Sequence, residues 1–168
     1  MTAPSEHTGF RVLGIDPGLH VTGYGCVVLP AAGAEPELVE AGAIRPDGGA
    51  SMAARLAQIH ADVGALLAEL RPDAVAVEKL YAHYKHPRTA ILMAHARGAV
   101  LLAAEQAGVG VRDVAATNVK KALTGNGHAS KRQVQLAVQA VWGLATPPEP
   151  PDVADALAIA LCALRHGG

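Results

Sequence analysis

The sequence predicts an α/β domain whose mixed sheet begins with a three-strand antiparallel meander and continues as α-β-α-β, with helices on both faces. Two observations predict this class. Short apolar runs of strand length, separated by turn residues, fill the region up to residue 44. Helical periodicity follows over residues 51–70, and strand-like and helix-like segments then alternate.

The three strands of the meander are expected at residues 10–16, 21–29 and 37–44. The first is an apolar run stopped by Pro17 and Gly18, a pair typical of turns. A second break, from Pro30 to Pro36, separates the other two strands. Short connections of this kind favour antiparallel neighbours.

A helix is expected from Ser51, a good N-cap, to residue 70. Its apolar residues recur at three- and four-residue spacing: Met52, Leu56, Ile59, Val63, Leu66, Leu67 and Leu70. The remaining elements are expected to be strands at 73–78 and 109–114 and helices at 87–107, 117–123, 131–142 and 152–164. We see no repeats, and expect a flexible N-terminus, residues 1–9, before a single domain, residues 10–165.

Charge is unevenly distributed along the chain. The formal net charge is only −1, yet residues 79–132 hold nine Lys/Arg and two acids, a local net charge of +7. The remaining residues hold five basic and thirteen acidic side chains, a net charge of −8. A basic middle segment can bind a polyanion even in a nearly neutral protein, although a merely solvated surface explains the charge equally well.

Composition excludes several classes of protein. Half of the residues are hydrophobic (51%), which is incompatible with a disordered chain. Only Cys26 and Cys162 are present, so a disulfide framework is not expected and a reducing compartment fits. We find no signal-peptide pattern at the N-terminus and no apolar run long enough to span a membrane, and therefore expect no membrane association.

Four carboxylates stand at element ends. Asp16 ends the first strand, Glu78 ends the fourth, and Asp152 and Asp155 open the last helix, three residues apart and hence on one face. Each has an ordinary alternative: a turn former, a solvated strand end, or an N-cap with its capping-box partner. Adjacent strands that end at the same sheet edge would instead bring Asp16 and Glu78 together.

Four converging carboxylates repel one another unless a cation lies among them. Hard oxygen ligands favour Mg²⁺ or Mn²⁺, and a pair of such ions is a standard device for attack on a phosphodiester. We therefore predict a metal site made of Asp16, Glu78, Asp152 and Asp155, with two Mg²⁺ ions that Mn²⁺ can replace.

Several motifs, in order, resemble the RuvC family of bacterial crossover (Holliday) junction resolvases. They are GIDPG at 14–18, TGYG at 22–25, VEKLY at 77–81, HARGA at 95–99, VKKALTGNGHASKRQV at 119–134 and DVADALAIA at 152–160. The resemblance covers about residues 10–164. GIDPG alone is weak, because sugar kinases and actin-like ATPases open similarly, whereas the ordered set is specific.

The resemblance implies a ribonuclease H-like fold and a metal-dependent endonuclease that nicks two opposing strands of a four-way DNA junction, leaving 5′-phosphate and 3′-hydroxyl ends. The family's four catalytic acids match Asp16, Glu78, Asp152 and Asp155. It also implies a homodimer, a junction-binding and branch-migration motor as partner, and a bacterial cytoplasmic, nucleoid-associated location.

DNA-contacting residues follow from the same resemblance. Tyr81 stands where the family carries an aromatic residue three positions after the glutamate, and its ring could stack on bases at the crossover. The family's basic residues near the active centre match Lys120 and Lys131, which could contact phosphate and stabilise the transition state. We expect Lys85, Arg88, Lys121 and Arg132 to extend this contact.

Three other functions compete with this interpretation. An actin-like ATP-binding protein needs two related domains, for which 168 residues are too few. A ribonuclease H would use the same carboxylates on an RNA–DNA hybrid. A non-enzymatic junction-binding protein would bind DNA without cutting it under any divalent metal.

Overall fold

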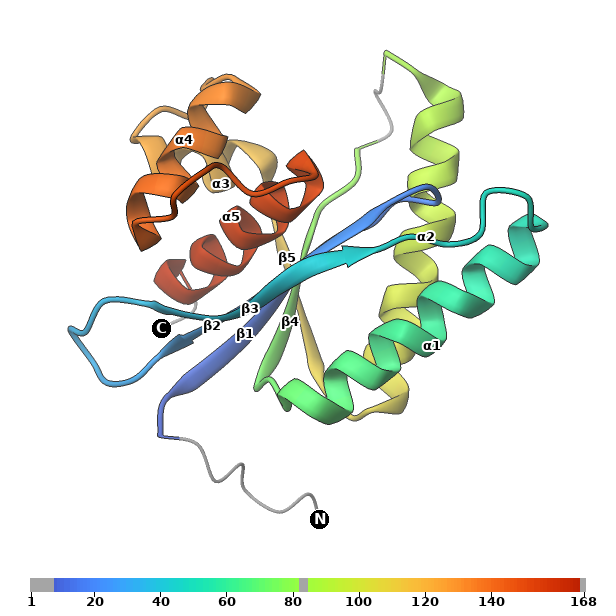
Figure 1. Cartoon of the computed structure of the whole chain (residues 1–168), viewed down its shortest axis with the longest axis horizontal. Coiled ribbons are helices and arrows are strands. Elements are labelled where there is room, and N and C mark those ends of the chain that lie inside the picture. Colours follow the sequence, from blue (N-terminus) through green and yellow to red (C-terminus); the bar gives the residue numbers. More distant parts are fainter. Residues whose placement is uncertain (1–7, 82–84, 167–168) are drawn as a thin grey trace.

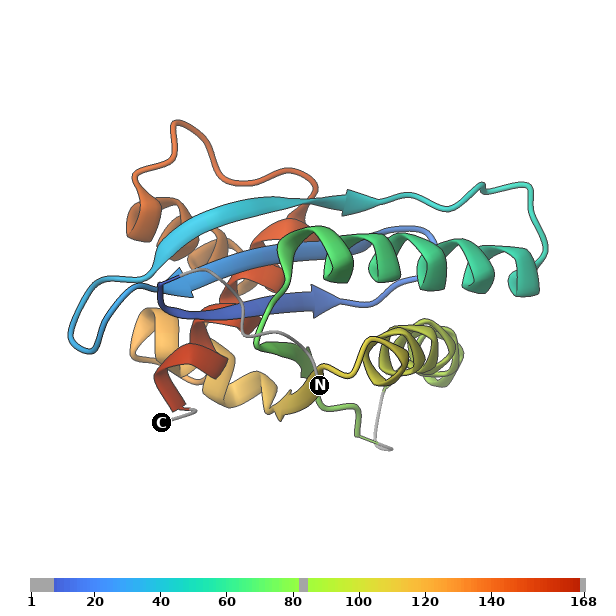
Figure 2. The same cartoon turned by 90° about the horizontal axis from the view of Figure 1, so that it is seen from below.

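A five-stranded mixed sheet forms the centre of the molecule and carries helices on both faces (Figures 1 and 2). The computed structural model describes residues 8–81 and 85–166. The strand order is β3-β2-β1-β4-β5, so the first strand is central and the third and fifth form the edges. The fold class expected from the sequence is therefore confirmed.

The first three strands form the predicted antiparallel meander. β1 pairs with β2 from Phe10 opposite Leu29 to Asp16 opposite Gly23. β4 lies on the other side of β1 and runs parallel to it, and β5 runs parallel to β4. The bounds are β1 Phe10–Asp16, β2 Thr22–Leu29, β3 Glu37–Ile44, β4 Ala74–Glu78 and β5 Gly110–Val114.

Two long helices cover one face of the sheet: α1 (Met52–Leu70) and α2 (Pro87–Gln106). Ser51 caps α1 as expected, because its side chain accepts a hydrogen bond from the backbone N–H of Ala54. Apolar side chains of these helices pack against apolar side chains of β1 and β4. The buried residues include Ile59 and Val63 of α1, Val100 of α2, Leu13 of β1 and Val75 of β4.

Three helices cover the other face: α3 (Ala116–Thr124), α4 (Lys131–Trp142) and α5 (Pro151–His166). α5 lies directly on β1 and β2, and α3 and α4 pack against it from outside. Eleven of its residues, Val153, Ala154 and all from Ala156 to Leu164, are buried. This helix is therefore the centre of the second core, and it carries two of the predicted catalytic acids.

The observed element bounds lie within about two residues of those expected from the sequence. One local interpretation is wrong: α5 begins at Pro151, so Asp152 lies inside the first turn and is not its N-cap. Residues 1–7 of the predicted flexible N-terminus lie outside the described residues. Among the residues the structure describes, no helix has the length and hydropathy needed to cross a membrane.

Candidate active site

Asp16 and Glu78 lie side by side at one edge of the sheet. β1 and β4 are parallel neighbours, and their register pairs Ile15 with Val77, the residues immediately before the two acids. Both strands end at these acids, so the carboxylates leave the sheet at the same edge. Both side chains are half-buried. The proximity expected from the strand ends is present.

The turn that follows Asp16 is held by a buried side chain. Thr22, which is fully buried, accepts a hydrogen bond from the backbone N–H of Gly18 (3.1 Å) and donates one to its carbonyl (2.8 Å). These two bonds close the connection between β1 and β2. The backbone next to Asp16 is therefore fixed on both sides, by the sheet before it and by this turn after it.

α5 reaches the same edge because two glycines let it touch the sheet. A Cβ built on Gly14 would stand 2.1 Å from the carbonyl oxygen of Ala156, and one on Gly23 would stand 2.1 Å from that of Asp152. Real Cβ atoms do not approach that closely, so only glycine allows this contact. Gly23 is the residue opposite Asp16 on β2. The first turn of α5 is thereby brought next to Asp16.

The pKa of Asp16 records this convergence. Burial raises it from 3.8 to about 8, and the negative charges of Asp155, Asp152 and Glu78 add to the rise. Burial also raises the pKa of Glu78 and the pKa of Asp155, and the negative charges of nearby acids add to both increases. The four side chains, which we call the acidic cluster, therefore form one electrostatic unit. Such a cluster favours either protons or cations among its members.

Lys120 of α3 and Lys131 of α4 are two basic side chains whose charges act on the acidic cluster. The Lys131 ammonium lies 3.7 Å from a carboxylate oxygen of Asp155, and its charge lowers the pKa of Asp16, Glu78 and Asp155. Lys120 lowers the pKa of Glu78 and Asp155. Both lysines thus partly offset the repulsion within the cluster.

The other predicted DNA-contacting residues lie on the surface without a described contact to the acidic cluster. Tyr81 is 58% exposed, three residues beyond Glu78. The exposed basic residues are Lys121 on α3, Arg132 on α4, Arg88 at the start of α2, and Lys85 two residues before α2. This exposure fits contact with a large ligand.

Arg97 of α2 lies near the site, and no role for it follows from the sequence analysis. It lines a small hollow together with Asp16, Pro17, Glu78, Leu80 and Met93. A signal was present: Arg97 is the only Asp, Glu, Lys or Arg between Arg88 and Glu105, in a mostly apolar stretch of the helix. A single charge in such a segment usually has a specific partner.

The donor chemistry of the acidic cluster fits a hard divalent cation, since every donor is a carboxylate oxygen. Within residues 8–81 and 85–166, however, no three carboxylate, histidine or cysteine side chains already form a metal site. Joint coordination by the cluster therefore requires its side chains to turn toward one another.

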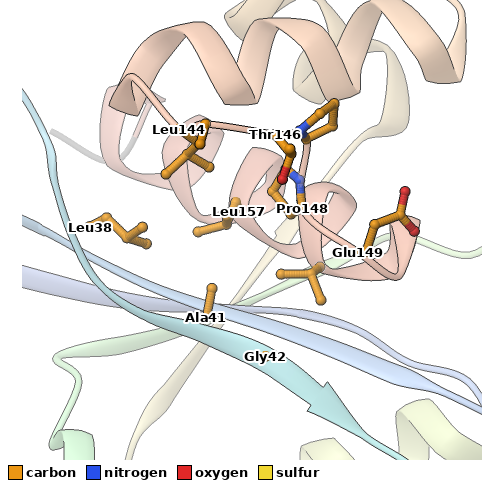
Figure 3. Close-up of a pocket in the computed structure, with 11 residues that line it drawn as sticks. Leu38, Ala41, Gly42, Leu144, Thr146, Pro148, Glu149 and Leu157 are labelled. Atoms are coloured by element: carbon orange, nitrogen blue, oxygen red, sulfur yellow. The ribbon is translucent and has the colours of Figure 1, made fainter.

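A larger groove lies on the same face of the sheet as α5 but does not include the acidic cluster (Figure 3). It has a volume of about 390 Å³ and lies between β3, residues 144–149 and α5. Its lining is mostly apolar, and Glu149 is its one charged side chain. Apolar grooves of this size are default candidates for ligand binding, but the carboxyl groups with raised pKa values lie at the sheet edge.

Comparison with known proteins finds similarity over most of the chain. A family model described as crossover junction endodeoxyribonuclease RuvC matches residues 12–163. A RuvC from Rhodopirellula baltica is 49% identical over 151 residues, which cover 90% of this chain and 84% of that protein. One from Gloeobacter violaceus is 45% identical over 158 residues, covering 94% and 90%.

Solved structures give the same match in three dimensions. The chain superposes on Thermus thermophilus RuvC in complex with a Holliday junction with a TM-score of 0.85 at 39% identity, covering 94% of both chains. The yeast mitochondrial Holliday junction resolvase is 14% identical with a TM-score of 0.64, covering 96% of this chain and 82% of that one, and supports the fold alone. These matches confirm the expected ribonuclease H-like fold.

Proposed function

The chain belongs to the RuvC family of crossover junction endodeoxyribonucleases, and we propose that it cleaves four-way junctions with the acidic cluster: Asp16, Glu78, Asp152 and Asp155. Members of this family are metal-dependent nucleases. One observation carries the assignment of residues. Two parallel strand ends and the first turn of a helix seated on glycines bring the four carboxylates close enough to share one electrostatic field.

We propose that the acidic cluster holds two Mg²⁺ ions, which Mn²⁺ can replace. When bound, such ions supply a nucleophilic water and stabilise charge on the phosphate and on the leaving oxygen. Asp16 is the central member, because the other three acids all raise its pKa. A pKa of about 8 means that Asp16 holds a proton near neutral pH when no cation is present, so proton release accompanies metal binding.

Lys120 and Lys131 have a different role in this proposal. Their ammonium groups lie at the border of the acidic cluster, where the scissile phosphate has to enter. They can attract that phosphate and oppose the growth of negative charge on it. Tyr81, Lys85, Arg88, Lys121 and Arg132 would bind the junction further from the scissile bond and fix its orientation, without changing the chemical step.

The overall reaction is symmetric nicking of two opposing strands, which leaves 5′-phosphate and 3′-hydroxyl ends that a ligase can join. Such an outcome requires two active centres related by a two-fold axis, so we propose a homodimer. The helices α1 and α2 offer a surface for it. Ile91 and Leu102 of α2 are 56% and 52% exposed, and an apolar groove of about 430 Å³ lies between the two helices.

Sedimentation of the wild type and of Leu102→Glu tests this surface. We expect a dimeric wild type and a monomeric variant, and a monomeric wild type bound to junction DNA would overturn the proposal. We also propose that residues 10–165 act as one nuclease domain. This domain would work in the bacterial cytoplasm at the nucleoid, together with a junction-binding and branch-migration motor. Copurification of such a motor with the tagged chain would support this partner, and its absence at native expression would contradict it.

Asp16→Asn tests the acidic cluster. The substitution keeps the size of the side chain but removes its charge, so we expect junction binding to persist while Mg²⁺-dependent cleavage falls at least about 10²-fold. Asp62→Asn on α1 is a matched control, since Asp62 lies on a helix outside the acidic cluster. Wild-type cleavage by Asp16→Asn would show that the site is elsewhere.

A further inference from the structure

Arg97 joins α2 to the ends of two strands. Its side chain is 20% exposed, and its guanidinium forms an ion pair with Asp113 of β5. Its Nε also donates a long hydrogen bond of 3.4 Å to the backbone carbonyl of Glu78, the last residue of β4. One guanidinium therefore contacts a neighbouring strand and the backbone of a predicted catalytic residue.

This contact lies where the sheet stops holding the backbone. The parallel register pairs Val77 with Asp113 and Glu78 with Val114, and the N–H of Lys79 donates to the Val114 carbonyl (2.8 Å). Beyond Lys79 no pairing of this strand is present in the part of the chain the structure describes. The orientation of the Glu78 side chain thus depends on two contacts to its backbone: the hydrogen bond from Lys79 to β5 and the hydrogen bond from Arg97 of α2.

The contact acts on geometry rather than on the electric field of the site. The charges that shift the pKa of Glu78 come from Asp155, Lys120 and Lys131. The positive charge of Arg97 is directed at Asp113, and its bond to Glu78 ends on the backbone and not on the carboxylate. A planar guanidinium with donors in a fixed fork is suited to hold two acceptors at a set angle.

We propose that Arg97, oriented by Asp113, is a positioning residue that fixes the end of β4 and keeps the Glu78 carboxylate on the hollow that Asp16 also lines. This inference rests on the proposed role of the acidic cluster. Removal of groups that orient metal ligands typically costs about 10–100-fold in metal affinity or activity. We expect Arg97→Gln to lower Mn²⁺ affinity and kcat within that range and to leave junction affinity unchanged.

The experiment compares Arg97→Gln with Arg112→Gln in the full-length protein. Arg112 of β5 is also half-buried and also donates to a backbone carbonyl, that of Ala163 (3.2 Å), but it lies over the ring of Phe10. Calorimetric titration with MnCl₂, junction binding without metal, single-turnover cleavage and the midpoint of thermal unfolding are measured for both. The control separates lost positioning from lost stability.

The proposal is supported if Arg97→Gln loses Mn²⁺ affinity and kcat while Arg112→Gln, with a comparable loss of thermal stability, keeps both. Arg97→Lys keeps the positive charge but not the planar fork, so it should recover only part of the loss, and Asp113→Asn should reproduce a milder form of it. These two variants also serve if Arg97→Gln does not fold. Wild-type Mn²⁺ affinity in Arg97→Gln, or a loss confined to junction binding, would overturn it. Cleavage by Asp16→Asn would instead overturn the acidic cluster itself, so the two failures are distinguishable.

Discussion

Gly23 packs against the backbone carbonyl of Asp152 so closely that a Cβ on Gly23 would stand 2.1 Å from that oxygen. Gly23 also lies opposite Asp16 in the sheet, so this contact, together with that of Gly14, sets the distance between the helix that carries Asp152 and Asp155 and the strand that carries Asp16. A residue with no side chain therefore helps to determine the shape of the acidic cluster.

Gly23→Ala should reduce both stability and cleavage. The new methyl group forces the first turn of α5 away from β2, and overpacking of this kind costs about 1–3 kcal/mol. Asp152 and Asp155 move with the helix, so cleavage should fall more than the loss of folded protein explains. Thermal unfolding and single-turnover cleavage of a junction measure the two effects.

Gly64→Ala on α1 is the matched control for this substitution, because a Cβ there meets nothing within 4 Å. In a helix interior alanine is favoured over glycine by roughly 0.5–1 kcal/mol, so this variant should be slightly more stable and fully active. Equal activity of Gly23→Ala and Gly64→Ala would contradict the proposed role of the contact.

The metal-free protein should lose stability as the pH rises from about 4 to about 8. In this window Asp16 is protonated in the folded state, where its pKa is about 8, and ionised in the unfolded state, where it is near 3.8. The folded state thus binds more protons, and the free energy of unfolding falls with increasing pH. Glu78 and Asp155, whose pKa values are also raised, act in the same direction.

The unfolding midpoint measured against pH in EDTA checks this expectation. Because asparagine does not titrate, Asp16→Asn should show a weaker decline and should be more stable than the wild type at pH 8. Adding Mg²⁺ at pH 8 should stabilise the wild type more than the variant. A pH dependence identical in the two proteins would mean that the Asp16 carboxyl titrates normally.

Lys131→Ala should raise the pH at which cleavage becomes half-maximal. Lys131 lowers the pKa of Asp16, Glu78 and Asp155, so its removal makes these acids harder to ionise. We also expect kcat to fall more than junction affinity, since Lys131 lies 3.7 Å from Asp155. Lys120→Ala should show the same behaviour through Glu78 and Asp155.

Arg132→Ala provides the comparison for the lysine variants, because Arg132 is the next residue on α4 and is exposed. We expect it to weaken junction binding and to reduce the dependence of binding on salt, with the pH profile unchanged. If Lys131→Ala behaves in the same way as Arg132→Ala, Lys131 is a phosphate contact only.

Substrate choice separates the remaining alternatives. With Mg²⁺ present, we expect cleavage of a synthetic four-way junction and little or none of a linear duplex or an RNA–DNA hybrid of the same sequence. Preferred cleavage of the hybrid would identify a ribonuclease H, and binding without cleavage under Mg²⁺ and Mn²⁺ would identify a junction-binding protein.

Much of the fold could be predicted because its signals are local. The apolar spacing from Met52 to Leu70 and the Ser51 cap define α1, and Gly and Pro residues mark the strand ends. The proximity of Asp16 and Glu78 could also be expected, since both are the last residue of an apolar strand.

The remaining features depend on contacts between residues far apart in the chain. That Gly14 and Gly23 serve to seat α5 is visible only once the helix is placed, because either glycine could equally end a strand or form a bulge. The bond from Arg97 to Glu78 spans 19 positions and ends on the backbone, so no residue pattern encodes it. Asp152 is a polar residue at the start of an apolar helical segment, which is the pattern of an N-cap. The helix instead begins one residue earlier at Pro151, because proline is favoured as the first helical residue.

The burial of α5 has a consequence for how this protein can fluctuate. Its apolar residues lie between the sheet and the pair formed by α3 and α4, so the helix cannot detach without opening the larger core. Its amides from Ala156 to Leu164 should therefore exchange with solvent only when the whole domain unfolds. Asp152 and Asp155 stand on this slowly opening helix, so the position of these two proposed catalytic carboxylates on the sheet should last as long as the native state.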